Sequence, residues 1–111
     1  MALCNIKLLG NNILYKDNQE IALSSNFSIE NSTNEEYSLQ AIPNIQNLPC
    51  EILLIDGPNV YNLNQPILFN KYLSFYIKII LNGVQESFQI NLVNASCDNE
   101  VVMTLNFIYE A

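Results

Sequence analysis

The sequence contains no histidine, no arginine and no tryptophan, and it has only three glycines in 111 residues. Histidine is the commonest general acid and base, and without it neither a Ser-His-Asp nor a Cys-His arrangement is possible. Glycine-rich phosphate-binding motifs are missing too, so the sequence has no loop that would bind the phosphates of a nucleotide cofactor. No stretch approaches the roughly 18 consecutive apolar residues of a membrane helix. We therefore expect a non-enzymatic protein with no cofactor and no membrane insertion.

Positive charge is also scarce, because four lysines stand against eleven acidic residues and the net charge is −7. Nucleic-acid binding depends on basic groups that release counterions from phosphates, so we expect no nucleic-acid partner. The first residues lack the apolar core and the upstream positive charge of a secretory signal. Acidic and amide side chains gather at 17–20 and 98–100. We expect turns there rather than a bound metal, because Asp and Asn favour turns for backbone reasons.

Half of the side chains are hydrophobic, and they recur with a period of two rather than 3.6. This alternation predicts strands along the whole chain and no helix. We expect a single domain over 1–111, an antiparallel β-sandwich of about eight strands with a jelly-roll-like order. The expected strands are 6–9, 13–16, 21–29, 37–41, 52–55, 72–81, 84–92 and 101–110.

The Asn82-Gly83 dipeptide lies between two alternating segments, which is a strong signal for a two-residue hairpin. Such a turn would pair Leu81 with Val84. It would also bring four inward-facing side chains to the centre of the core: Phe75, Ile77, Phe88 and Ile90. A second tight turn is expected at Gly10-Asn11-Asn12, between the 6–9 and 13–16 strands.

The last predicted strand, 101–110, alternates Val101, Met103, Leu105, Phe107 and Tyr109 inward with Thr104, Asn106 and Glu110 outward. It contains no proline and no lysine, residues that commonly protect exposed strand edges. One interpretation is an edge strand that another chain can extend. The alternative, a strand inside the sheet, where such a composition is also expected, is equally consistent with the sequence.

Several apolar side chains fall on predicted outer faces, namely Tyr76, Ile80, Val93, Val102 and Ile108. An apolar surface on a protein with so few charges suggests contact with a partner. The alternative, that these side chains are covered within one subunit or are singly exposed, is equally consistent with the sequence. On the first interpretation the protein is a structural subunit that associates with its own copies, or with another structural protein, into a fibre, appendage, coat or viral particle.

Three cysteines cannot all pair within one chain, and their separations match no zinc motif. Cys4 lies near the chain end, so we expect an accessible thiol that could link neighbouring copies through Cys50 or Cys97. In length, strand number and the position of Cys4, the chain resembles the single-jelly-roll subunits of bacterial spore appendages and of viral coats. If the protein is such an assembly subunit, a cell-surface, spore-surface or virion location follows. Neither a family nor a residue role is inferred from the resemblance. It covers no diagnostic motif.

A different function is suggested by the long connection at 57–66, which follows Gly57 and ends at Pro66. Sugar sites usually combine an aromatic ring with hydrogen-bonding side chains. This connection offers Tyr61 with Asn59, Asn62 and Asn64. The alternative hypothesis is therefore a small module that binds carbohydrate or another protein through this loop.

Overall fold

The computed structural model describes residues 2–16, 20–23 and 25–110, and it confirms an all-β, β-sandwich-like fold. Within these described ranges, ten strands form two five-stranded sheets. The first sheet has the order β1 (Asn11–Tyr15), β10 (Glu100–Tyr109), β9 (Phe88–Asn94), β4 (Tyr37–Pro43) and β7 (Ile67–Phe69). In the second sheet, β2 (Glu20–Ala22) and β3 (Phe27–Ile29) both pair with β8 (Leu73–Leu81), which is followed by β5 (Cys50–Asp56) and β6 (Asn59–Asn62).

The strand number and order differ from the sequence prediction. Residues 6–9 form no strand, the 21–29 segment is split into β2 and β3, and two short strands, β6 and β7, pair where connections were expected. The jelly-roll order is not confirmed, because β9 and β10 are neighbours in one sheet and β1 runs parallel to β10. No helix of the described residues is long and apolar enough to cross a membrane.

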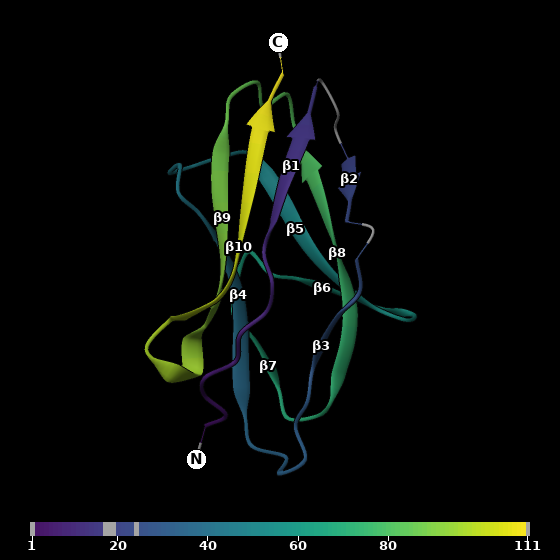
Figure 1. Cartoon of the computed structure of the whole chain (residues 1–111), viewed down its shortest axis with the longest axis vertical. Helices are drawn as coiled ribbons and strands as arrows, with labels where there is room; N and C mark the ends of the chain where they lie inside the picture. Colours follow the sequence, from purple (N-terminus) through teal and green to yellow (C-terminus); the bar gives the residue numbers. More distant parts are fainter. Residues whose placement is uncertain (1, 17–19, 24, 111) are drawn as a thin grey trace.

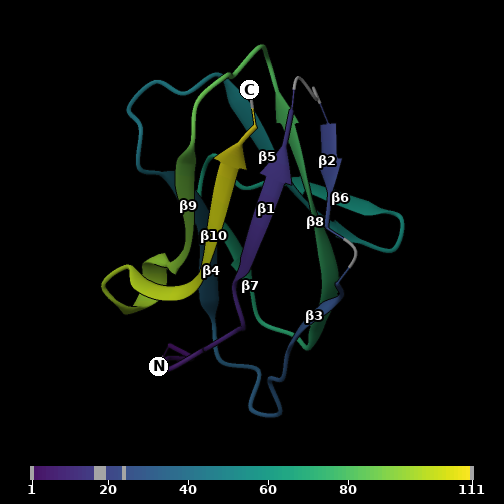
Figure 2. The same cartoon turned by 45° about the horizontal axis from the view of Figure 1, so that its top comes forward.

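The hairpin predicted at Asn82-Gly83 is wrong, because β8 and β9 belong to different sheets (Figure 2). β8 pairs with β5 on one side and with β2 and β3 on the other, whereas β9 pairs with β10 and β4. The expected turn needs positive φ at both central residues, and of the two only Gly83 has it, at 72°. The chain instead crosses from one layer to the other between Leu81 and Phe88.

The side chains expected at the centre of the core are nevertheless buried. Phe75, Ile77, Phe88 and Ile90 are all at most 5% exposed. The ring of Phe88 stacks on that of Phe107 with centroids 4.7 Å apart, and both rings contact Tyr15 edge-on. The two sheets therefore face each other across an aromatic and aliphatic core.

Gly10 occupies an extended stretch, and the turn predicted at 10–12 is not formed. Residues 8–15 pass along β10 in one direction, from the Leu8 N–H that donates to Val102 O to the parallel pairing of β1 (Figure 1). A Cβ atom built on Gly10 would lie 2.0 Å from the carbonyl oxygen of Thr104. Glycine is needed at this position because the two backbones approach too closely for any side chain.

The last strand is interior, which contradicts the edge-strand interpretation and agrees with the alternative, because β10 lies between β1 and β9. A register shift between Val101 and Met103 also changes which side chains face inward. Val101, expected inward, is exposed, whereas Val102 is buried. The alternation predicted for Met103, Leu105 and Phe107 is confirmed.

The two sheets are also connected through Leu63, a residue between β6 and β7. The N–H of Leu63 donates to Ile52 O, and the carbonyl of Leu63 accepts from Ala41 N–H, each over 2.8 Å. Leu63 is fully buried. It therefore joins β5 of the second sheet to β4 of the first.

Candidate functional site

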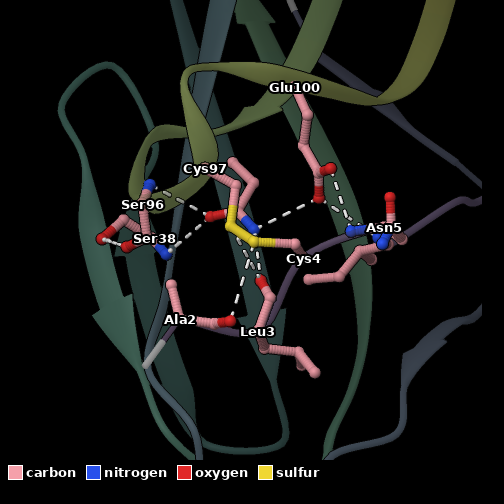
Figure 3. The surroundings of a disulfide bond; sticks show 10 residues. Ala2, Leu3, Cys4, Asn5, Ser38, Ser96, Cys97 and Glu100 are labelled. Atoms are coloured by element: carbon pink, nitrogen blue, oxygen red, sulfur yellow. Dashed lines mark hydrogen bonds between the residues drawn. A yellow bond between two sulfur atoms is a disulfide. The ribbon is translucent and has the colours of Figure 1, made fainter.

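The start of the chain is attached to the turn between β9 and β10 by a disulfide bond. Cys4 pairs with Cys97, at the end of a short 3-10 helix, η1 (Ala95–Cys97), as Figure 3 shows. The accessible thiol predicted for Cys4 is therefore absent from this structure. Sequence spacing gave no sign of the pairing, since 93 positions separate the two cysteines.

Two polar side chains complete this attachment, and sequence reasoning missed both. The buried Asn94 accepts the N–H groups of Ser38 and Ser96 through Oδ1, and its Nδ2 donates to Leu3 O over 2.7 Å. The Glu100 carboxylate accepts the backbone N–H groups of Asn5 and Ile6 at 2.9 and 3.1 Å. Both side chains thus hold the N-terminal segment against the turn between β9 and β10.

The pKa of Glu100 is lowered by this arrangement. Partial burial acts to raise the pKa, but the N–H groups of Asn5 and Ile6, the Asn94 amide and the charge of Lys7 outweigh it. A carboxyl group whose folded pKa is depressed stabilises the fold fully above its ordinary value of 4.5. This stabilisation is lost as the pH falls through the folded pKa.

We expect the Glu100→Gln substitution to weaken the dependence of the unfolding free energy on pH below neutrality. Urea unfolding of the wild type, measured from neutral pH to about pH 3, should show a falling midpoint below the ordinary pKa of glutamate. The midpoint of the variant should be lower than that of the wild type at neutral pH, and it should fall less on acidification. Glu51→Gln, a change on the outer face of the second sheet, serves as the control and should keep the wild-type slope. Parallel profiles for wild type and Glu100→Gln would contradict the role assigned to this carboxylate.

Cys50 is the free cysteine of the described residues, and it is buried at the start of β5. Burial raises the pKa of its thiol, which keeps the group protonated and unreactive. A link between Cys4 of one copy and Cys50 of another therefore has no support in this geometry.

The ligand loop predicted at 57–66 is largely an ordered hairpin in which β6 pairs with β5. The Tyr61 ring packs edge-on against Phe69, with centroids 5.1 Å apart. Asn64 uses its side chain on β5, accepting from Ile52 N–H and donating to Cys50 O, each over 2.9 Å. Asn59 and Asn62 are exposed, but Asn62 accepts from Asn64 N–H. The four side chains do not converge on a common cavity.

The apolar residues predicted at a subunit contact are separated by the fold. Tyr76 and Ile80 lie on the outer face of β8, whereas Ile108 lies on the outer face of β10, in the other sheet. Val93 and Val102 were predicted to face outward and are 4% and 2% exposed. They are covered where the register of β10 shifts.

The strands of the first sheet carry almost no charge. Glu100 is the one charged residue in its five strands, and its carboxylate is directed to the backbone of Asn5 and Ile6. By contrast, Glu20, Glu51 and Lys78 lie on the strands of the second sheet. We call the surface of the first sheet the neutral face; its outward residues are Asn12, Leu14, Ser38, Gln40, Ile42, Leu68, Gln89, Asn91, Val101, Thr104, Asn106 and Ile108.

Amide side chains on the neutral face are tied into a row across three strands. Asn106 Nδ2 donates to Asn12 Oδ1 over 3.0 Å, and its Oδ1 accepts from Gln89 Nε2 over 2.9 Å. The Thr104 hydroxyl donates to Asn91 Oδ1 in the next row. Beside the amide row, Leu14 and Ile108 are paired neighbours and both exposed. The sequence placed Asn106 and Ile108 outward correctly, but which strands share a face follows from the topology.

The described residues contain no group of three or more Cys, Asp or Glu side chains that could hold a metal ion. Asp98 and Asn99 have positive φ, as expected for a turn; residues 17–19 of the other predicted turn lie outside the described residues. A cleft of about 640 Å³ beside Glu35, Glu36 and Ser96 is open to solvent.

Comparison with protein-family models, with curated proteins and with solved structures finds no match for this chain.

Proposed function

We propose that this protein is a structural subunit whose copies associate through the neutral face, as part of a fibre, appendage, coat or other particle. The observation that supports the proposal is the distribution of charge. A chain with a net charge of −7 carries no free charge on the strands of one whole face. Depletion of charged residues is the compositional signal of an interface core, because a charge buried without a partner is costly.

Copies of the same chain are the partner that this face fits best. An amide side chain carries both a donor and an acceptor, so a row of amides is complementary to an identical row turned by a two-fold axis. The hydrogen bonds from Asn12 to Asn106 and from Asn106 to Gln89 already order these side chains. Less conformational entropy is then lost when the surface is buried.

Binding of carbohydrate through the 57–66 segment is the weaker candidate. A sugar ring needs an accessible aromatic face, and Tyr61 instead packs against Phe69. The neutral face offers no aromatic side chain among its outward residues either. The side chains of Asn59 and Asn62 alone supply too few groups for a site.

Leu14→Lys is expected to disrupt the association. Leu14 is 63% exposed, so the lysine should not disturb folding, but a two-fold contact would then bring two new positive charges into an uncharged interface. We expect the dissociation constant of the pair to rise by about tenfold or more, measured by sedimentation velocity over a range of concentrations.

Val60→Lys is the matched control. Val60 is also an aliphatic residue on an edge strand and is 59% exposed, but it lies in the second sheet. This variant should associate like the wild type. A wild type that remains monomeric at high concentration would refute the proposal, as would equal weakening by both substitutions.

A further inference from the structure

Asn82 and Gly83 lie in a bend between the two sheets, and they do not form the hairpin turn that an Asn-Gly sequence favours. Of the 18 asparagines in the chain, only Asn82 precedes a glycine. Both residues are exposed where the chain leaves β8 and crosses to β9. Asn82 N–H donates to Pro49 O over 3.1 Å, which fixes the backbone on one side of the bend.

The Asn82 side chain and the Gly83 N–H have no hydrogen-bond partner within the described part of the chain. A Cβ built on Gly83 would meet no atom within 4 Å, so the bend is open on the side of the glycine. Gly83 itself has no side chain to obstruct an approach to its nitrogen.

We propose that Asn82 is a site of spontaneous covalent modification, in which the backbone nitrogen of Gly83 attacks the side-chain carbonyl carbon of Asn82. The nitrogen loses its proton and forms a bond to Cγ, the Cγ–Nδ2 bond breaks, and ammonia leaves. The five-membered succinimide that results is opened by one water molecule at either carbonyl. The products are aspartate, with the original backbone, and isoaspartate, whose main chain passes through the former side chain.

Two other positions show why the reaction is specific to Asn82. Asn94 is fully buried, and its amide is hydrogen-bonded at both ends, to Leu3 O through Nδ2 and to Ser38 N–H and Ser96 N–H through Oδ1, so attack on its carbonyl carbon would break these bonds. Asp56 also precedes a glycine, Gly57, but its carboxylate forms an ion pair with Lys71 at 3.4 Å. An ionised carboxylate resists attack by a nucleophile, because its negative charge opposes the approach and it has no good leaving group.

The modification would change the structure where the two sheets are connected. Isoaspartate adds a methylene group to the main chain between Leu81 and Val84, which are both buried. Either product also adds a carboxylate and makes the net charge, −7 in the unmodified chain, more negative by one unit. We expect the isoaspartate form to unfold at a lower temperature than the unmodified protein, because the longer connection shifts two core residues.

The test is incubation of the folded protein at mildly alkaline pH, followed by peptide mass spectrometry and enzymatic methylation of isoaspartate. A mass gain of about 1 Da should appear at residue 82, faster than at any other asparagine, and its rate should rise with pH. Asn82→Gln is the control, because attack on glutamine requires a larger and slower-forming ring. A form unmodified at residue 82 while other asparagines convert would overturn the proposal. Conversion in urea but not in the folded protein would overturn it too.

Discussion

Replacing Phe88 by alanine is expected to lower the free energy of unfolding by about 3–5 kcal/mol. The ring is 5% exposed and stacks on Phe107, with Tyr15 edge-on at a centroid distance of 6.0 Å. Its removal leaves a cavity between the two sheets that the rigid aromatic neighbours cannot fill. Urea unfolding should show a lower midpoint with an unchanged slope.

Lys78→Ala provides the comparison on the outer face of β8. Lys78 forms an ion pair with Glu20, 2.7 Å apart, but both side chains are partly exposed. Exposed pairs contribute little, so the urea midpoint should change only slightly. If both midpoints fell by the same amount, the assignment of inward and outward faces would be wrong.

Cys4→Ser should also have a large effect, because the Cys4–Cys97 bond links two parts of the chain that are 93 positions apart. A cross-link over so long a segment restricts the unfolded chain, and its loss typically costs about 2–5 kcal/mol. Thermal unfolding with and without a thiol reductant measures this. Reductant should lower the melting temperature of the wild type toward that of Cys4→Ser and leave the variant unchanged.

A non-reducing denaturing gel separates this pairing from a link between subunits. An intrachain bond predicts a monomer band in both proteins, with the wild type migrating faster because its denatured chain is more compact. A ladder in the wild type that disappears in Cys4→Ser would show that Cys4 joins different copies instead.

The sequence predicted which side chains face the core better than it predicted which strands pair. Alternation placed Phe75, Ile77, Phe88 and Ile90 inward, and all four are buried. The same alternation arises whether β8 and β9 are neighbours in one sheet or face each other across the core. Periodicity therefore could not reveal that the predicted hairpin is a crossing between layers.

The errors near the N-terminus have a related cause. Gly10 was interpreted as a turn residue, because glycine commonly permits positive φ. Its actual role is a close approach to the carbonyl of Thr104, a residue 94 positions away in the chain. Only knowledge of the parallel pairing between β1 and β10 would have distinguished the two explanations.

The neutral face, too, could be predicted only in part from the sequence. Each strand's outward residues can be read from its own alternation, and Asn106 and Ile108 were assigned correctly. The face as a whole emerges only when strands from both halves of the sequence are placed side by side. Val102 was misassigned because a one-residue register shift leaves no signature in the hydrophobic pattern.

The pairing of β1 with β10 has a consequence for the order in which the protein is made. A ribosome releases residues 11–15 long before residues 100–109, yet these two segments are neighbours in the first sheet. During synthesis β1 has no partner strand, and the Tyr15 ring lacks Phe107 and Tyr109, two of its aromatic neighbours. The first sheet is thus completed only after residues 100–109 have been made, and a chain interrupted before β10 lacks the strand that both β1 and β9 require.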